Sequence, residues 1–262
     1  MADKYQELKN KALAARRTVI TESSRSGSVH IASSLSEIDL LTALYSKILQ
    51  KKDKFILSKG HGALGYYAVL AEYGFIPREE LNKYGQDGTK LSVHPVYKTA
   101  PGIEASTGSL GHGLPMALGL ALAARQDKND GHSYVLLSDG ECDEGSTWEA
   151  AMLAGHLKLD NLVAIIDYNK FQAFGKTKDI LDLEPFADKW QAAKWAVKEI
   201  NGHNFEEIIN ALEKLPLEKN KPTVFIAHTV KGKGVPYMEN KLDWHYFNVK
   251  AEDLDKTLEE LY

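Results

Sequence analysis

Short apolar segments that alternate with helical segments are the feature that most constrains the fold of this chain. Three of them have the length and composition of buried strands, at residues 134–137, 162–166 and 223–227. About twenty residues separate the first two, which suffices for a helical crossover between parallel strands. Strands without a polar face indicate a parallel sheet covered on both faces. The pattern therefore predicts a three-layer α/β/α fold with a central, mostly parallel sheet.

The intervening segments predict the helices, which we expect over residues 4–22, 62–73, 110–125, 147–157 and 204–215. Ser34 is the predicted N-cap of a further helix over 35–49, in which Glu37 would complete a capping box. Residues 85–109 are rich in Gly, Pro, Ser and Thr, and structureless loops of this length are usually functional. No linker interrupts the series, so we expect a single domain over residues 1–262.

Composition excludes several classes of function. The net charge is −4, with 32 basic and 36 acidic residues, which argues against a nucleic-acid partner. Cys142 is the only cysteine, so an intramolecular disulfide and a cysteine-rich zinc site are both excluded. Residues 1–10 are too polar for a signal peptide, and no apolar run could span a membrane. We therefore expect a cytoplasmic protein without a membrane partner.

Polar residues follow two of the predicted strands where each strand ends. Asp139 follows the first strand and Asn169 follows the second, so the two converge if the strands are neighbours. A carboxylate and an amide oxygen leave room in the shell of Mg²⁺ for diphosphate oxygens. Gly140 and Gly145 would permit close approach, and the helix that begins near Ser146 would direct its N-terminus at the anion. A simple turn capped by Asp139 remains an equal alternative at this point.

The residues around this pair resemble the thiamine diphosphate motif of transketolases, which begins with Gly-Asp-Gly and ends with Asn. The matching string comprises residues 138–145, Trp148-Glu149-Ala150, residues 159–162 and Asp167-Tyr168-Asn169. Further matches extend the resemblance over nearly the whole chain, at His30, residues 58–62, His94-Pro95, residues 102–104 and 107–111, Lys231-Gly232-Lys233-Gly234 and Trp244-His245. An extended string of this kind is much more specific than Gly-Asp-Gly alone.

The resemblance implies a role for each matching residue. Mg²⁺, or alternatively Ca²⁺ or Mn²⁺, would be bound by Asp139, Asn169 and the backbone carbonyl of Phe171. Thiamine diphosphate would contact His61, Gly108, Ser109, Leu110, Gly140, Glu141 and Asn169. The positions that face the substrate, or lie at the subunit interface beside it, would be His30, His94, His245 and Glu144. Histidine suits proton transfer to and from alkoxides near neutral pH.

The family's pyrimidine-binding and C-terminal domains have no counterpart in this sequence. The resemblance therefore implies the N-terminal subunit of a two-chain transketolase, which moves a two-carbon ketol unit from a ketose to an aldehyde. It would be inactive without a C-terminal subunit that carries the two other domains. We expect sugar or sugar-phosphate substrates and an α2β2 assembly.

Some residues depart from the family pattern. Ser138 replaces the first glycine of the motif, and Val29 and Ala32 stand where glycines are usual near His30. Tyr246 and Phe247 replace the usual glycine after His245, either near the substrate entrance or packed under the C-terminal helix. An aromatic entrance would favour an unusual donor or acceptor.

Two other functions remain open. A 1-deoxyxylulose-phosphate-synthase-like or 2-oxoacid-decarboxylating subunit would keep the cofactor and the metal motif. A non-catalytic regulatory subunit would keep only the fold. Trp148-Glu149 and Trp244-His245 favour a transketolase, and the intact metal and histidine positions argue against a decayed site.

Overall fold

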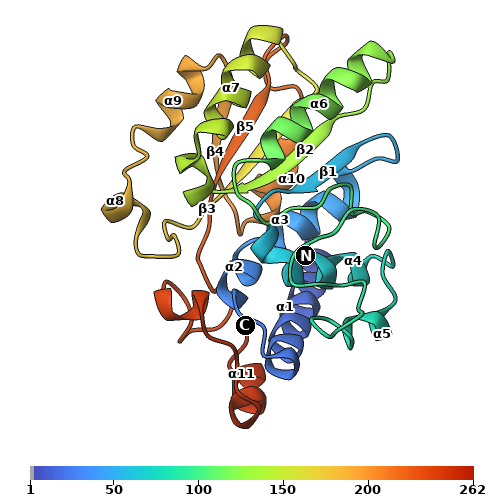
Figure 1. Cartoon of the computed structure of the whole chain (residues 1–262), viewed down its shortest axis with the longest axis vertical. Helices are drawn as coiled ribbons and strands as arrows, with labels where there is room; N and C mark the ends of the chain where they lie inside the picture. The colour runs from blue at the N-terminus through green and yellow to red at the C-terminus, as the bar shows by residue number, and fades with distance from the viewer. Residues whose placement is uncertain (1–2) are drawn as a thin grey trace.

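The computed structural model describes residues 3–262. Five parallel strands form a sheet in the order β1-β2-β3-β5-β4, and Figure 1 shows helices on both sides of it. Their bounds are Lys54–Leu57 (β1), Ser133–Ser138 (β2), Leu162–Tyr168 (β3), Ala196–Asn201 (β4) and Thr223–His228 (β5). The predicted α/β class and parallel sheet are confirmed, and each of the three predicted strands is present.

The two edge strands, β1 and β4, were not predicted. The central strands β2 and β3 are buried along their whole length, which gives the unbroken apolar runs of the sequence. By contrast, β1 begins with the exposed Lys54, and β4 carries the partly exposed Lys198 and the exposed Glu199. An edge strand has fewer neighbours to bury its side chains, so its sequence pattern is weaker.

Alternate residues of the strands enter two separate apolar cores. Leu136 belongs to one core, whereas its neighbours Val135 and Leu137 belong to the other. The first core is covered by α1 (Gln6–Ser26), α3 (Ile38–Ala43), α4 (Ala63–Glu72) and α10 (Phe205–Leu212). The second is covered by α6 (Gly113–Gln126), α7 (Gly145–Leu157) and α9 (Phe186–Ala192). This arrangement gives the three predicted layers.

The predicted helix over residues 35–49 is confirmed only in part, because it is divided and its N-cap is wrong. Ser34 lies inside α2 (Ile31–Ser36), which starts after His30, and the chain continues through α3 and a π-helical turn, η1 (Leu44–Ile48). Glu37 separates α2 from α3, and its carboxylate turns inward to pair with Nζ of Lys59 at 3.1 Å. A carboxylate with a buried ion-pair partner does not complete a capping box, so Ser34 is not an N-cap.

The other predicted helices are present, with ends displaced by a few residues. Three further short α-helices are α5 (Arg78–Leu81), α8 (Thr177–Ile180) and α11 (Leu254–Glu259). The described residues also include the 3-10 turns η2 (Gly60–Gly62), η3 (Gly140–Asp143), η4 (Leu242–His245) and η5 (Ala251–Asp253). The predicted long loop lies between α5 and α6, where no helix or strand is assigned to residues 82–112. No helix within residues 3–262 combines the length and the apolar character needed to cross a membrane.

Candidate active site

The carboxyl ends of β2 and β3 bring Asp139 and Asn169 into one pocket, as predicted. The strands are neighbours in parallel register, with Ser138 opposite Asp167. The pocket has a volume of about 390 Å³. Its lining includes most of the predicted site residues, namely His30, His61, His94, Gly108, Leu110, Asp139, Gly140, Glu144, Asn169, Phe171 and His245.

The carboxylate of Asp139 is buried and has only neutral hydrogen-bond donors. Oδ1 accepts from N of Gly140 at 2.8 Å, and Oδ2 accepts from N of Lys170 at 2.7 Å and Oγ1 of Thr177 at 3.0 Å. Within residues 3–262 it forms no ion pair. Burial, with the nearby charge of Asp167, raises the pKa of Asp139 to about 7. A bound cation would supply the missing countercharge, so the residue fits a metal site.

Asn169 and Phe171 form the turn that faces Asp139. Oδ1 of Asn169 accepts from N of Phe171 at 3.1 Å, which leaves the amide oxygen a second lone pair. Lys170 between them is in the left-handed region, with φ of 68°. No three His, Cys, Asp or Glu side chains of the described chain are grouped so as to hold a metal. The carboxylate, amide and carbonyl oxygens match instead a magnesium ion completed by phosphate oxygens.

Two glycines allow side chains of the pocket to pack closely against the backbone. Gly108 has φ of 150°, and a Cβ there would lie 3.0 Å from Cδ2 of His94. A Cβ at Gly140 would lie 2.9 Å from Cγ of Gln172. Any larger residue would displace pocket side chains at either position.

Three imidazoles of the pocket lie close together. The ring of His30 lies 4.6 Å from that of His245 and 5.6 Å from that of His61, measured between centroids. A backbone hydrogen bond holds His30 beside His245, since N of His30 donates to O of His245 at 3.1 Å. Nδ1 of His30 is buried without a partner among residues 3–262, so a ligand atom could satisfy it. His94 enters from the long loop between α5 and α6.

These imidazoles are neutral at physiological pH. Burial lowers the pKa of His30 and of His94, and the charge of His94 adds to the shift at His30. Burial and the charge of Lys59 lower the pKa of His61, and burial with Lys231 lowers the pKa of His245 to about 3. A neutral imidazole offers one donor and one acceptor nitrogen, which suits proton exchange with hydroxyl groups.

Lys231 is a pocket residue to which the sequence pattern assigns no role. Its Nζ donates to Nδ1 of His245 at 3.1 Å, and only 1% of the residue is exposed. Burial lowers its pKa to about 8. The match at Lys231-Gly232-Lys233-Gly234 includes this residue, but the pattern does not indicate which of the two lysines faces the pocket. Ser33, Asp143, Gln172, Ala173 and Phe174 also line the pocket without having been predicted.

Two predicted cofactor contacts, Glu141 and Ser109, are not part of the pocket lining. The buried carboxylate of Glu141 accepts from Oγ of Ser58 and from N of Gly111 at 2.8 Å. The Glu141 carboxylate therefore holds the backbone of the loop before α6 in place. Ser109 is exposed in that same loop. Glu144 lies at the N-terminus of α7 and does line the pocket.

A buried charge network supports the floor of the site. Nζ of Lys59 lies 2.5 Å from Oδ2 of Asp167 and 2.9 Å from O of Ser33. With the Glu37 contact, this ammonium group connects β1, β3 and the start of α3. Burial opposes ionisation of Asp167, but Lys59 outweighs it and holds the pKa below the usual value. The network fixes the segment that carries His61 relative to the segment that ends at Asn169.

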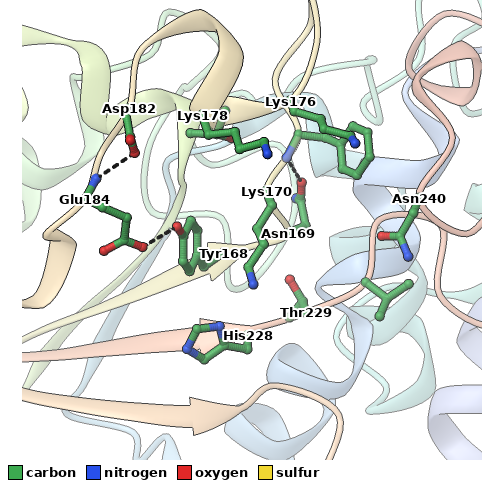
Figure 2. A pocket seen from close by; sticks show the side chains of 13 residues that line it. Tyr168, Asn169, Lys170, Lys176, Lys178, Asp182, Glu184, His228, Thr229 and Asn240 are labelled. Atoms are coloured by element: carbon green, nitrogen blue, oxygen red, sulfur yellow. Dashed lines mark hydrogen bonds between the residues drawn. The ribbon is translucent and has the colours of Figure 1, made fainter.

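A second, larger pocket lies behind the same turn (Figure 2). Its volume is about 720 Å³, and it shares Asn169 and Phe171 with the histidine-lined pocket. A bridge between Phe171 and Lys176 makes residues 171–176 a small hairpin that separates the two pockets. None of the predicted catalytic histidines lines this second pocket.

The aromatic pair after His245 is not packed under the C-terminal helix. Tyr246 is 48% exposed and Phe247 is 56% exposed. Oη of Tyr246 donates to O of Ala173 at 2.8 Å, and its ring lies 5.0 Å from that of His245. Tyr246 therefore lies beside the histidine-lined pocket, whereas the ring of Phe247 lies edge-on to that of Trp244.

The chain matches the family model described as transketolase, thiamine diphosphate binding domain, over residues 9–261. It is 43% identical to one subunit of the apulose-4-phosphate transketolase of Actinobacillus succinogenes, over 98% of this chain and 96% of that protein. It is 39% identical to one subunit of the 6-deoxy-6-sulfo-D-fructose transketolase of a Clostridium species, over 96% and 95% of the two chains.

Longer relatives contain the same region. Human transketolase is 35% identical over 99% of this chain, which corresponds to 42% of the human protein. The crystal structure of Campylobacter jejuni transketolase superposes with a TM-score of 0.88 at 30% identity, over 97% of this chain and 42% of that one. The chain therefore belongs to the transketolase family, as the thiamine diphosphate-binding subunit of a split, transketolase-type transferase.

Proposed function

We propose that the chain binds thiamine diphosphate through Mg²⁺ and, with a second subunit, transfers a two-carbon ketol unit from a ketose to an aldehyde. One observation carries the proposal. A single pocket holds a buried carboxylate without a countercharge together with a cluster of neutral imidazoles. The carboxylate suits a metal diphosphate, and the imidazoles suit proton exchange with sugar hydroxyls.

The residues of the pocket would have different roles in binding the metal and the cofactor. Asp139, Asn169 and the carbonyl of Phe171 would hold the metal, because the three residues line one pocket at or just beyond the ends of β2 and β3. Gly108 and Gly140 let His94 and Gln172 pack against the backbone of the pocket, and the N-terminus of α7 (Gly145–Leu157) favours the charge of a diphosphate. Thiamine diphosphate, when bound, supplies the electron sink for the acyl carbon.

The histidines would act on the substrate. Nδ1 of His30 has no protein partner within residues 3–262, so it is free to bind a donor hydroxyl. Lys231 holds the ring of His245 through Nδ1, which directs Nε2 away from the lysine. His94 faces the site across Gly108 and would contact the same ligand from the loop side. Each neutral ring can accept a proton from an alcohol and return it to an alkoxide.

The second subunit is inferred from the relatives. Two similar proteins of nearly the same length are named as subunits of transketolases, and full-length transketolases extend well beyond the region that this chain matches. We infer that a separate chain supplies the remainder and that the two assemble as α2β2. The relatives' names include a sugar phosphate and a sulfonated sugar, so an anionic ketose is the donor class that we propose.

Co-expression with a candidate second subunit, encoded beside this chain, tests the function. The purified pair should transfer a ketol unit from a ketose phosphate to an aldehyde when thiamine diphosphate and Mg²⁺ are present, and each chain alone should not. EDTA should abolish the activity, and added Mg²⁺ should restore it. A pair that decarboxylates a 2-oxoacid but transfers no ketol would replace this proposal with the decarboxylase alternative.

A further inference from the structure

Tyr246 connects two walls of the histidine-lined pocket, although it does not line the pocket itself. Its hydroxyl donates to O of Ala173 at 2.8 Å, and its ring lies edge-on to that of His245, with 5.0 Å between the centroids. Both of these neighbours line the pocket. Tyr246 and Ala173 are 73 positions apart in the sequence, so the bond joins the C-terminal segment to the hairpin 171–176.

The tip of the hairpin, residues 173–174, has few restraints of its own. N of Gln172 donates to O of Gly175 at 2.8 Å within the hairpin, and the side chain of Phe174 is 81% exposed. Among residues 3–262, the hydroxyl of Tyr246 is the only group of another segment that hydrogen-bonds to residues 173–174. A short two-stranded hairpin is marginally stable by itself, so an external contact at the tip contributes to its order.

The base of the hairpin is anchored more firmly. Nε2 of Gln172 donates to Oδ2 of Asp143 at 2.7 Å. On either side of the hairpin, N of Lys170 and Oγ1 of Thr177 donate to Oδ2 of Asp139. The tip is therefore the part of the hairpin whose position a contact from the C-terminal segment can change.

The C-terminal segment is held in place from the opposite side of the pocket. O of His245 accepts from N of His30 at 3.1 Å, and Nδ1 of His245 accepts from Nζ of Lys231 at 3.1 Å. N of Tyr246 donates to O of Asp243 at 2.9 Å. Because the backbone from which Tyr246 extends is held by these bonds, its hydroxyl can restrain the hairpin.

The hairpin begins at a proposed metal ligand. Phe171, whose carbonyl would bind Mg²⁺, is separated from Ala173 by a single residue. N of Phe171 donates to Oδ1 of Asn169 at 3.1 Å, so a shift of the hairpin reaches both proposed ligands of this turn. Mg²⁺ requires near-ideal octahedral geometry, and displacement of the turn would weaken the metal site.

We propose that Tyr246 is a positioning residue for the metal-bound cofactor. Its hydroxyl holds the tip of the hairpin 171–176 beside His245 and thereby slows the release of thiamine diphosphate. This inference rests on the proposed function, because it requires that the pocket binds this cofactor. The hydroxyl acts through the backbone of Ala173 and needs no contact with a ligand.

Tyr246→Phe tests the role, because it removes the hydroxyl and keeps the ring. In the assembled pair loaded with Mg²⁺ and labelled thiamine diphosphate, a chase with unlabelled cofactor measures release. We expect the release rate to rise by about two- to tenfold, as for the loss of one neutral hydrogen bond. The kcat at saturating cofactor should fall by a smaller factor. Tyr246→Ala, which also removes the ring, should release the cofactor at least as fast, and circular dichroism spectra verify folding.

Tyr73→Phe is the matched control. Oη of Tyr73 also donates to a backbone carbonyl, that of Thr42 at 3.1 Å, and Tyr73 lines neither pocket. Its substitution should leave the release rate within about twofold of the wild-type value. Equal acceleration by Tyr73→Phe and Tyr246→Phe would show a general loss of stability and would overturn the positioning role.

Hydrogen exchange tests the contact without the cofactor. In the chain alone, the amide of Gln172, which donates to O of Gly175, should exchange faster in Tyr246→Phe than in the wild type, because the hairpin opens more often. Exchange in β2 (Ser133–Ser138) should not change. Equal protection of Gln172 in both proteins would mean that the hydroxyl does not hold the hairpin, and the proposal would be wrong.

The outcomes separate this inference from the proposed function. If the wild-type pair binds no thiamine diphosphate, both fail. If the wild type binds the cofactor and transfers a ketol unit while Tyr246→Phe releases the cofactor at the wild-type rate, only the positioning role is wrong. If kcat at saturating cofactor falls by more than the release rate rises, Tyr246 acts on the reaction itself, and its assignment to cofactor retention is overturned.

Discussion

The carboxylate of Asp139 connects the ligand site with the local fold. One of its oxygens fixes the start of η3, and the other holds the backbone of Lys170 and the hydroxyl of Thr177. The same side chain that would bind the metal therefore shapes the turn that carries the other two proposed ligands.

Replacement of Asp139 by alanine should remove metal-dependent cofactor binding. We expect at least about a tenfold rise in the dissociation constant for thiamine diphosphate in the presence of Mg²⁺, since a charged ligand is lost. Titration calorimetry of the assembled pair measures it. Asn201→Ala is the matched control, because Asn201 ends β4 at the same edge of the sheet but lines neither pocket. Equal binding by the two variants would show that the metal is held elsewhere.

The buried histidines make the chain sensitive to acid. The pKa of His245 is lowered to about 3 in the folded state, below its usual value near 6.5. Between those values the unfolded chain binds the extra proton, so the free energy of unfolding falls as the pH falls from 6.5 towards 3. One such group contributes a slope of up to about 1.4 kcal/mol per pH unit. His245→Gln should reduce the slope in urea titrations, and an unchanged slope would contradict the assignment.

Residue roles were predictable from the sequence only where a motif fixes the position of a side chain. Asp139 and Asn169 follow strands, so their convergence needs only the order of β2 and β3. The side chain of Lys231 points into the pocket because it hydrogen-bonds to His245. The carboxylate of Glu141 is kept out of the pocket lining by its hydrogen bond from Ser58. Such partners lie far away in the sequence, and no local pattern specifies them.

At the scale of elements, both the local sequence and the tertiary packing of α10 (Phe205–Leu212) favour a helix. Oδ1 of Asn204 accepts from N of Glu207 at 3.2 Å and caps the helix. Phe205, Ile208 and Ile209 face the first core. The helix lies away from both pockets, so its stability can be changed without altering the site.

Asn204→Ala should lower the free energy of unfolding by about 1 kcal/mol, because an N–H group at the helix start loses its acceptor. Cofactor binding should not change. Chemical denaturation and calorimetry, run side by side, measure the two quantities. Asn204→Ser restores a capping oxygen and should recover most of the loss; failure to recover it would mean that the cap is not the cause.

The helices and strands were predicted correctly where their residues are fully buried. The prediction failed where a single long-range contact determines how a helix ends. The strands β2, β3 and β5 carry apolar runs because both of their faces are covered. The edge strands mix polar and apolar residues and were missed. The helix expected over 35–49 is divided because Glu37 reaches the buried Lys59, a partner more than twenty positions away that no capping rule includes.

At the scale of the whole molecule, the two cores share every strand of one sheet. Adjacent residues of a strand enter opposite cores, so neither layer of helices can detach without exposing the other face. We therefore expect one cooperative unfolding transition.

Cys142 can report that transition. Its thiol is 1% exposed in the second core, and burial raises its pKa, so it should resist labelling in the folded chain. In a urea series, the fraction of Cys142 labelled in short pulses should follow the loss of far-ultraviolet circular dichroism. Labelling at a lower urea concentration would reveal separate opening of the layer formed by α6, α7 and α9.

The hairpin 171–176 limits how this chain could be recombined with foreign partners. Its base continues the turn that carries Asn169 and Phe171, and its tip carries Phe174, which is 81% exposed. A chimaera that exchanges the whole segment would replace the proposed ligand Phe171 together with the exposed tip. Exchange of residues 173–175 and 246–247 alone would leave Asn169 and Phe171 in their native setting. A crossover placed inside the hairpin therefore separates the exposed surface of this segment from the proposed metal ligands.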